Sequence, residues 1–344
     1  MVESQDAYAT AGQHYTSSIR RDWVKRSWEE PAFHRHLDAA LERAGSHGLR
    51  SDLDVLDVGC GTGVALDLLL GAPSLVGGRR TLNRATGVDL DEGLLSIARD
   101  RFADDPRMTF TRGDLSSVPD TGPHDLVLSS GVPFSHLTPE QLEPALARIA
   151  QVALGTRTDA AAPRSALVIV DVLGRYSLEW TTRWDQTRWE YRMSFFATDE
   201  EVAATPMTTW DGEALDATIR RAAAAAQAEV VDLVLVDRSL AVGRHTMTGE
   251  YTPELPRLRD LVDALAEGTE VDPALLRITL SLPDAPDAVL EAHAAFAAAW
   301  NAALTEPLAP SAMAERLRDV EATFEGAGLG LGHSLTAFAL LARA

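Results

Sequence analysis

The sequence has few of the residues on which several common functions depend. Its 344 residues include one cysteine, Cys60, which excludes an internal disulfide and a metal site built from several cysteines. No apolar run approaches the ~20 residues that cross a membrane. The N-terminal segment is acidic and lacks a hydrophobic signal core, so we expect a cytoplasmic protein.

Basic residues are outnumbered by acidic ones. The chain has 31 Lys and Arg against 51 Asp and Glu, a formal net charge of −20. Such a surface repels a phosphate backbone, so nucleic acid is not expected as a partner. The same acidity also serves to keep a protein soluble. The histidines are scattered without a His-x-x-x-His or paired-carboxylate motif, and we therefore expect no metal.

The most informative stretch is an apolar strand that runs into a glycine-rich turn and then a helix, over residues 53–70. Gly59, Gly61 and Gly63 stand at alternate positions, so the backbone can turn tightly with no side chain between it and a ligand. The amides at the helix start would face that ligand. No Lys-Ser or Lys-Thr follows, which excludes a phosphate-binding loop. Asp57, at the strand end, would repel a pyrophosphate and suits a ligand with a positively charged amino group.

Residues 56–63, Leu-Asp-Val-Gly-Cys-Gly-Thr-Gly, resemble the first motif of class I S-adenosylmethionine-dependent methyltransferases. The resemblance covers residues 55–175 well and the rest of the chain poorly. It implies an α/β fold: a doubly wound, Rossmann-like sheet of seven strands, the last one antiparallel and inserted between the fifth and sixth. It also implies that the glycine loop, with Cys60, wraps the methionine part of S-adenosylmethionine.

Apolar strands alternate with helices in the order that a doubly wound sheet requires, and such a sheet binds ligands at the carboxyl ends of its strands. We predict a long loop over 71–84. The strands are predicted at 54–58, 85–90, 108–111, 125–130, 166–173, 229–240 and within 330–341, and the helices at 64–70, 92–102, from 139 and at 212–227.

Acidic residues follow the second and third strands. Asp89 can accept a hydrogen bond from each ribose hydroxyl, and Asp91 is a second candidate. By resemblance to the third motif of the family, Asp114 would accept a hydrogen bond from the adenine amino group, with Leu115 against the ring. Two further cofactor-binding residues expected beside these strand ends are Leu90 and Ser130.

The N-terminal residues 8–15 resemble the leader that closes over the cofactor in many family members. The resemblance implies that Tyr15 or His14 reaches the active site, and the alternative is that Tyr15 only packs a helix onto the core. Two helices are predicted, around 19–28 and 33–49, separated by Pro31.

Six segments describe the predicted organisation. Most family members join the last strands by a short turn, so the alanine-rich insertion is a departure, and its pattern does not distinguish a dimer contact from a pocket cover. The segments are an N-terminal helical cap (1–50), a Rossmann-like cofactor-binding core (51–175), an aromatic-rich lid or acceptor segment (176–210), a core continuation (211–240), a helical insertion (241–330) and a final core strand (331–344).

Methyl transfer from a sulfonium mainly requires alignment of donor and acceptor and exclusion of water. A base is needed only if the acceptor keeps its proton. His136, in the loop after the fourth strand, is the candidate base because an unperturbed histidine has a pKa of about 6.5. The alternative is that His136 only holds loop hydrogen bonds.

The aromatic segment 176–196 suits a wall for an apolar or aromatic acceptor, or a cage for a cationic amine. Packing of its rings against the core is the equally open alternative, since Trp180 and Trp184 stand at helical spacing. The candidate acceptor-pocket residues are Phe134, Trp180, Trp184 and His245.

Together these features predict a methyltransferase that uses S-adenosylmethionine, leaves S-adenosylhomocysteine and acts on a small molecule of specialised metabolism. Residues 130–134 lack the Asn/Asp-Pro-Pro-Tyr/Phe signature of enzymes that methylate nucleic-acid bases, which favours O- or C-methylation. The alternatives are N-methylation of a small amine, methylation of a protein or peptide, and a non-catalytic cofactor-binding scaffold. Nicotinamide oxidoreduction is disfavoured by Asp57 and by the lack of a fitting Tyr-Lys pair.

Overall fold

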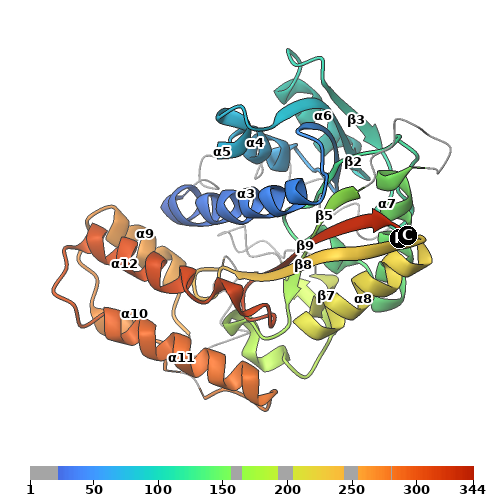
Figure 1. Cartoon of the computed structure of the whole chain (residues 1–344). Helices are drawn as coiled ribbons and strands as arrows, with labels where there is room; N and C mark the ends of the chain where they lie inside the picture. Colours follow the sequence, from blue (N-terminus) through green and yellow to red (C-terminus); the bar gives the residue numbers. More distant parts are fainter. Residues whose placement is uncertain (1–21, 156–164, 193–203, 244–254, 280) are drawn as a thin grey trace.

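The computed structural model describes residues 22–155, 165–192, 204–243, 255–279 and 281–344. Over these residues a twisted mixed sheet carries helices on both faces, and a group of helices from the second half of the chain lies to one side (Figure 1). None of the helices in the described ranges is both long and apolar enough to cross a membrane.

Five strands of the sheet are parallel, in the order β3-β2-β1-β4-β5. The strand β5 is buried along its whole length, which is typical of a parallel strand covered on both faces. The bounds are β1 (Asp52–Val58), β2 (Thr81–Asp89), β3 (Met108–Arg112), β4 (Leu126–Leu128) and β5 (Ser165–Gly174).

The last strand, β9 (Ser334–Arg343), lies antiparallel between β5 and β8 (Ala228–Arg238). It pairs with β5 from Ser334 opposite Leu173 to Ala342 opposite Ser165. The predicted Rossmann-like sheet with its inserted antiparallel strand is therefore confirmed. The loop predicted over 71–84 is too long, because a short helix, α5 (Pro73–Val76), lies within it and β2 begins at Thr81.

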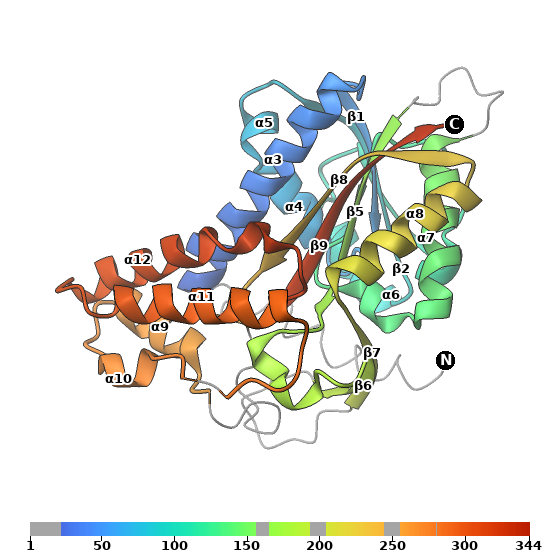
Figure 2. The same ribbon diagram turned by 60° about the horizontal axis from the view of Figure 1, so that its bottom comes forward.

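Each face of the sheet has its own hydrophobic core. The helices α3 (Glu30–Ser46) and α4 (Val64–Leu70) pack on one face, and α7 (Pro139–Leu154) and α8 (Gly212–Ala225) pack on the other (Figure 2). The helix α6 (Glu92–Arg101) contacts β2 and β3. The helix predicted from residue 139 is confirmed, and it begins with a capping box and a proline in the first turn.

The prediction that Pro31 separates two N-terminal helices is wrong. The chain is helical from Trp23 to Ser46, with a π-helical turn, η2 (Lys25–Glu29), directly before α3. The amide of Glu30 donates to the carbonyl of Lys25, a bond between residues five apart. A proline ring normally clashes with the carbonyl four residues earlier, and the wider π turn accommodates it.

The predicted insertion is helical and shares a core with the aromatic segment and the N-terminal helix. Its helices are α9 (Leu258–Ala266), α10 (Pro273–Leu276), α11 (Asp287–Ala303) and α12 (Pro310–Ala322). Trp28, Trp180 and Trp300 belong to one buried cluster, so the insertion is packed onto the rest of the chain and not merely tethered to it.

A hairpin of β6 (Arg188–Arg192) and β7 (Ala204–Trp210) extends from the end of β5. The sequence prediction contains no strand here. The alternation of Arg188, Trp189, Glu190, Tyr191 and Arg192 between polar and aromatic residues is the period-two signal that could have found β6.

Arg259 on α9 joins the insertion to the N-terminal helix. Its guanidinium donates two hydrogen bonds of 2.8 Å to Asp22 and one of 2.7 Å to Glu29. We expect Arg259→Ala to lower the free energy of unfolding by about 3 kcal/mol, because it removes the buried cation that Asp22 and Glu29 share and leaves Glu29 only its longer pair with Lys25. Urea unfolding measures the change.

Arg316→Ala is the matched control. Arg316 pairs with Glu306 on the surface at 2.9 Å, and such an exposed pair contributes less than about 1 kcal/mol. Equal losses in the two variants would contradict a structural role for the buried pair.

Candidate functional site

The glycine turn between β1 and α4 has a backbone that only glycine adopts easily. Gly59, Gly61 and Gly63 have φ values of 69°, 52° and 78°. A Cβ at Gly59 would lie 2.7 Å from Cβ of Pro133, so glycine lets the loop after β4 approach. A Cβ at Gly61 would meet no described atom within 4 Å, which leaves the turn open on that side.

Asp57, at the end of β1, is wholly buried. Neither of its carboxylate oxygens has a hydrogen-bond partner among the described residues. Burial, together with the nearby charge of Asp89, raises the pKa of Asp57 to about 8. A buried carboxyl group without a partner is unfavourable for folding and marks a place where a ligand cation fits.

Asp89, at the end of β2, is bound to the same turn. One oxygen accepts a hydrogen bond of 2.8 Å from the amide of Gly61, and the other accepts one of 2.9 Å from the amide of Asp91. Burial raises the pKa of Asp89. A carboxylate has about four acceptor positions, so Asp89 retains capacity for two hydroxyl donors.

The neighbouring candidates have distinct surroundings. Asp91 caps α6 by accepting a hydrogen bond of 2.9 Å from the amide of Leu94, which favours Asp89 over Asp91 for the ribose. Leu90 is 40% exposed and so presents apolar surface beside Asp89.

Asp114 follows β3, and one of its oxygens accepts from the amide and hydroxyl of Ser116 at 2.8 and 2.7 Å. Leu115 and Ser130 are half-buried. The amide of Gly113, just before Asp114, donates to the carbonyl of Asp89 at 3.0 Å, so the ends of β2 and β3 are adjacent. The acidic residues predicted at these strand ends therefore lie at one edge of the sheet, around the glycine turn.

His136 lies in a short 3-10 helix, η4 (Pro133–His136), after β4 and is half-buried. Burial, and to a smaller extent the charge of Arg188, lowers the pKa of His136 to about 4. The pKa of His136 thus lies below the unperturbed value of about 6.5 for which this residue is a candidate base. An imidazole of such low basicity is neutral at pH 7 and a weak proton acceptor.

The three acceptor-pocket candidates within the described residues do not all lie together. Phe134 is wholly buried in the core under α7 and α8. Trp180 and Trp184 are buried in the separate core shared with the insertion. Their indole N–H groups donate to the carbonyls of Gly174 and Ser177 at 3.0 and 2.9 Å, which is the packing role that the sequence left open. Tyr15, His14 and His245 lie outside the described residues.

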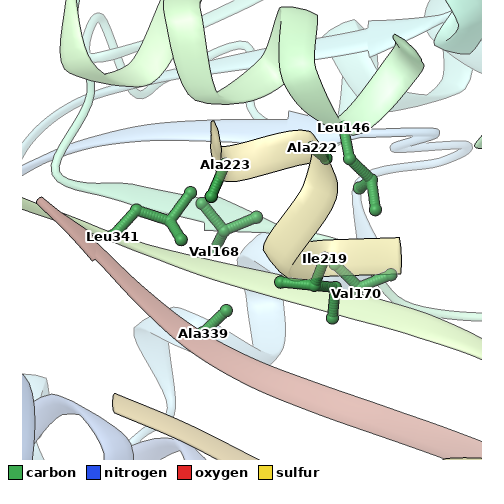
Figure 3. Close-up of a pocket in the computed structure, with 8 residues that line it drawn as sticks. All are labelled: Leu146, Val168, Val170, Ile219, Ala222, Ala223, Ala339 and Leu341. Carbon is green, nitrogen blue, oxygen red and sulfur yellow. The ribbon is translucent and has the colours of Figure 1, made fainter. Parts of the chain in front are cut away.

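A small apolar cavity lies between α7, α8 and the sheet, away from the strand ends (Figure 3). Ala339 and Leu341 of β9 pair with Val168 and Ala166 of β5, toward the amino end of β5. The cavity offers no polar group to a cofactor, and we interpret it as a packing gap. Its lining residues are Leu146, Val168, Val170, Ile219, Ala222, Ala223, Ala339 and Leu341. In the part of the chain that the structure describes, no three His, Cys, Asp or Glu side chains are grouped to hold a metal ion.

Comparison with known proteins identifies the segment that contains this edge. Residues 55–154 match the family model described as a methyltransferase domain. Over 81 residues the chain is 37% identical to the malonyl-[acyl-carrier protein] O-methyltransferase of Acetivibrio thermocellus. The glycine turn, the sheet order and this match agree with one another. Residues 55–154 therefore form a methyltransferase domain.

The matches beyond this domain are limited. The alignment with the Acetivibrio protein covers 24% of this chain and 26% of that protein, about a quarter of its length. A S-adenosylmethionine-dependent methyltransferase from Clostridium acetobutylicum is 15% identical, with a TM-score of 0.43 over 66% of this chain and 90% of that one. CalS10, an amino pentose methyltransferase from Micromonospora echinaspora, is 17% identical, with a TM-score of 0.39 over the same shares. Structural scores this low carry no argument about function.

Asp171 is a structural residue of the sheet that the sequence interpretation missed. It lies within β5, and one oxygen accepts from the amides of Gly131 and Val132 at 3.0 and 3.3 Å. The other accepts from Thr336 at 2.7 Å and Arg238 at 2.8 Å. Asp171 thus holds the loop after β4 against β8 and β9. An acidic residue inside a continuous apolar strand was the signal available.

The raised pKa of Asp57 predicts how the stability of the folded state depends on pH. The ordinary value of 3.8 applies to the unfolded chain, and the folded value is about 8, so between these values only the unfolded chain has released the proton. This group therefore makes the folded state less stable as pH rises from 4 to 8. We expect the neutral variant Asp57→Asn to melt several degrees above wild type at pH 9 and close to wild type at pH 4.

Calorimetric melting without ligand at both pH values measures the difference. Asp104→Asn, at an exposed position, is the control and should show no such dependence on pH. A variant Asp57→Asn that melts below wild type at pH 9 would contradict the assignment of a strained, buried carboxylate.

Proposed function

We propose that this protein is an enzyme that transfers the methyl group of S-adenosylmethionine to a small-molecule acceptor and releases S-adenosylhomocysteine. The observation that carries the proposal is the buried, unpartnered carboxyl group of Asp57 beneath the open glycine turn. Its chemistry fits the amino group of the methionine part of the cofactor, which is positively charged. When bound, the sulfonium supplies an activated methyl group, so the chain's own work is to bind, align and exclude water.

Each residue at the edge has a proposed part in binding. Asp57 pairs with the amino group, and the turn around Cys60 wraps the methionine part. Asp89 accepts hydrogen bonds from the two ribose hydroxyls. The proposed adenine contacts are Asp114 with the amino group and Leu90 and Leu115 with the ring, and Ser130 lies beside the methionine part.

The acceptor is proposed to be small and to be methylated on oxygen or carbon. The net charge of −20 is unsuited to nucleic acid. The loop over 130–134 lacks the signature of enzymes that methylate nucleic-acid bases, and Phe134 is turned into the core. The Acetivibrio relative is an O-methyltransferase by name, which supports oxygen as the acceptor atom.

Calorimetric titration with S-adenosylmethionine and S-adenosylhomocysteine tests the proposal. We expect micromolar affinity in wild type. In Asp89→Ala we expect affinity at least tenfold weaker, since two hydrogen bonds to a charged acceptor contribute roughly 1.5–3 kcal/mol each.

The control is Asp216→Ala, which removes a surface carboxylate that pairs with Arg220 on α8. Its affinity should equal that of wild type. If folded wild-type protein binds neither compound, the proposed cofactor site is wrong.

A further inference from the structure

Glu179 and His333 form a side-chain pair at the ligand-binding edge of the sheet. His333 immediately precedes β9, and because β9 runs antiparallel to β5, it lies beside the end of β5. The carbonyl of His333 accepts from the amide of Gly174 at 3.2 Å, and its amide donates to the carbonyl of Ser239 at 2.9 Å. Figure 2 shows this start of β9 at the end of the sheet from which β7 also extends.

The contact between the two side chains is close and largely enclosed. Nδ1 of His333 lies 2.5 Å from Oε2 of Glu179. The Glu179 side chain is wholly buried, whereas 17% of the His333 side chain is exposed. The ring of Trp180 packs edge-on against the imidazole, with centroids 5.5 Å apart. The pair therefore has a buried acid and an imidazole that reaches the surface of the edge.

Neighbouring residues pack closely around the carboxylate of Glu179. A Cβ at Gly243 would lie 2.1 Å from the carboxyl carbon of Glu179, so a larger residue there would displace the acid. The amide of Glu179 donates to the hydroxyl of Ser177 at 3.3 Å. Three segments far apart in the sequence, at 177–180, 243 and 333, thus meet at the pair.

A carboxylate against Nδ1 has two consequences for an imidazole. It fixes the tautomer in which Nδ1 carries the proton, so that Nε2 has the lone pair. It also stabilises the imidazolium that forms when Nε2 takes up a proton. His136 has the opposite surroundings, since burial and the cation Arg188 lower its pKa to about 4.

The position of His333 relative to the loop after β4 also suits an acceptor. The strand β5 lies between β4 and β9, so about 10 Å separates the loop after β4 from the start of β9, at roughly 4.8 Å per strand. A small acceptor that binds over the end of β5 would therefore lie between that loop and His333.

We propose that His333 is the general base of the acceptor site, that Glu179 is its positioning residue, and that the acceptor carries a hydroxyl proton. The inference rests on the proposed function and names its substrate class. Nε2 of His333 takes the acceptor proton, and the electron pair left on oxygen bonds to the methyl carbon. The carbon–sulfur bonding pair stays on sulfur as a neutral thioether, and the proton on His333 passes to water.

The first test needs no acceptor. Diethyl pyrocarbonate modifies a neutral imidazole that solvent can reach, and peptide mass spectrometry reports each histidine separately. Above the pH range in which an ordinary imidazole is protonated, we expect His333 to react in wild type. We expect it to react several-fold more slowly in Glu179→Gln, because the amide leaves Nε2 less nucleophilic than the carboxylate does. Exposed His47 is the positive control, and His124 and His293, which are buried, are the negative controls.

The second test compares acceptors. Wild type and His333→Ala are assayed for S-adenosylhomocysteine release with a panel of phenols and alcohols, and with 4-nitrothiophenol, whose thiol is already ionised at pH 7. Where a hydroxyl acceptor reacts, we expect His333→Ala to lose about 100-fold with it, and added imidazole to restore part of the rate. Transfer to the thiolate should be unchanged.

The results separate this proposal from the cofactor assignment. If His333 fails to react while His47 reacts fully, the base role is wrong, whether or not an acceptor has been found. An equal loss with hydroxyl and thiolate acceptors would also overturn it. Calorimetric binding of S-adenosylhomocysteine by wild type and His333→Ala reports the cofactor site independently and should be the same in both.

Discussion

The antiparallel pairing of β9 with both β5 and β8 is the constraint on which the site depends. This strand returns the end of the chain to the middle of the sheet after the helical insertion. It places Thr336 against Asp171, which holds the loop after β4, and it places His333 beside Gly174. Without this pairing His333 would not lie beside the end of β5, which Glu179 follows in the sequence.

The buried acidic residues of this protein differ in whether other protein groups donate hydrogen bonds to their carboxyl oxygens. The difference distinguishes acids that stabilise the fold from one that is available to a ligand. Asp171 accepts four hydrogen bonds, and Asp237 accepts hydrogen bonds from the amides of residues 329–331. Glu321 accepts from Trp28 and from the amide of Ala241. These three acids hold the chain together. Asp57 has no such partner among the described residues, and it is the one at the open glycine turn.

The helical insertion supports the segment that follows β5. Its core includes the aromatic rings that follow β5, and His293 of α11 stacks on Trp184 with centroids 5.3 Å apart. Arg259 and Glu321 connect it to the N-terminal helix through buried polar contacts. The segment that holds Glu179 is thus packed between the sheet and the insertion, which gives the buried acid a rigid setting.

The sequence by itself determined the features that local patterns encode. The glycine turn follows from three glycines at alternate positions, α4 occupies the predicted residues 64–70, and the acids near the ends of β1, β2 and β3 follow from strand periodicity. Only the tertiary structure decided which distant side chains meet. Glu179 and His333 are 154 positions apart, and helical spacing could not tell whether Trp180 and Trp184 face a ligand or a core. Periodicity reports the face on which a side chain lies, whereas its partners depend on how the strands and helices pack.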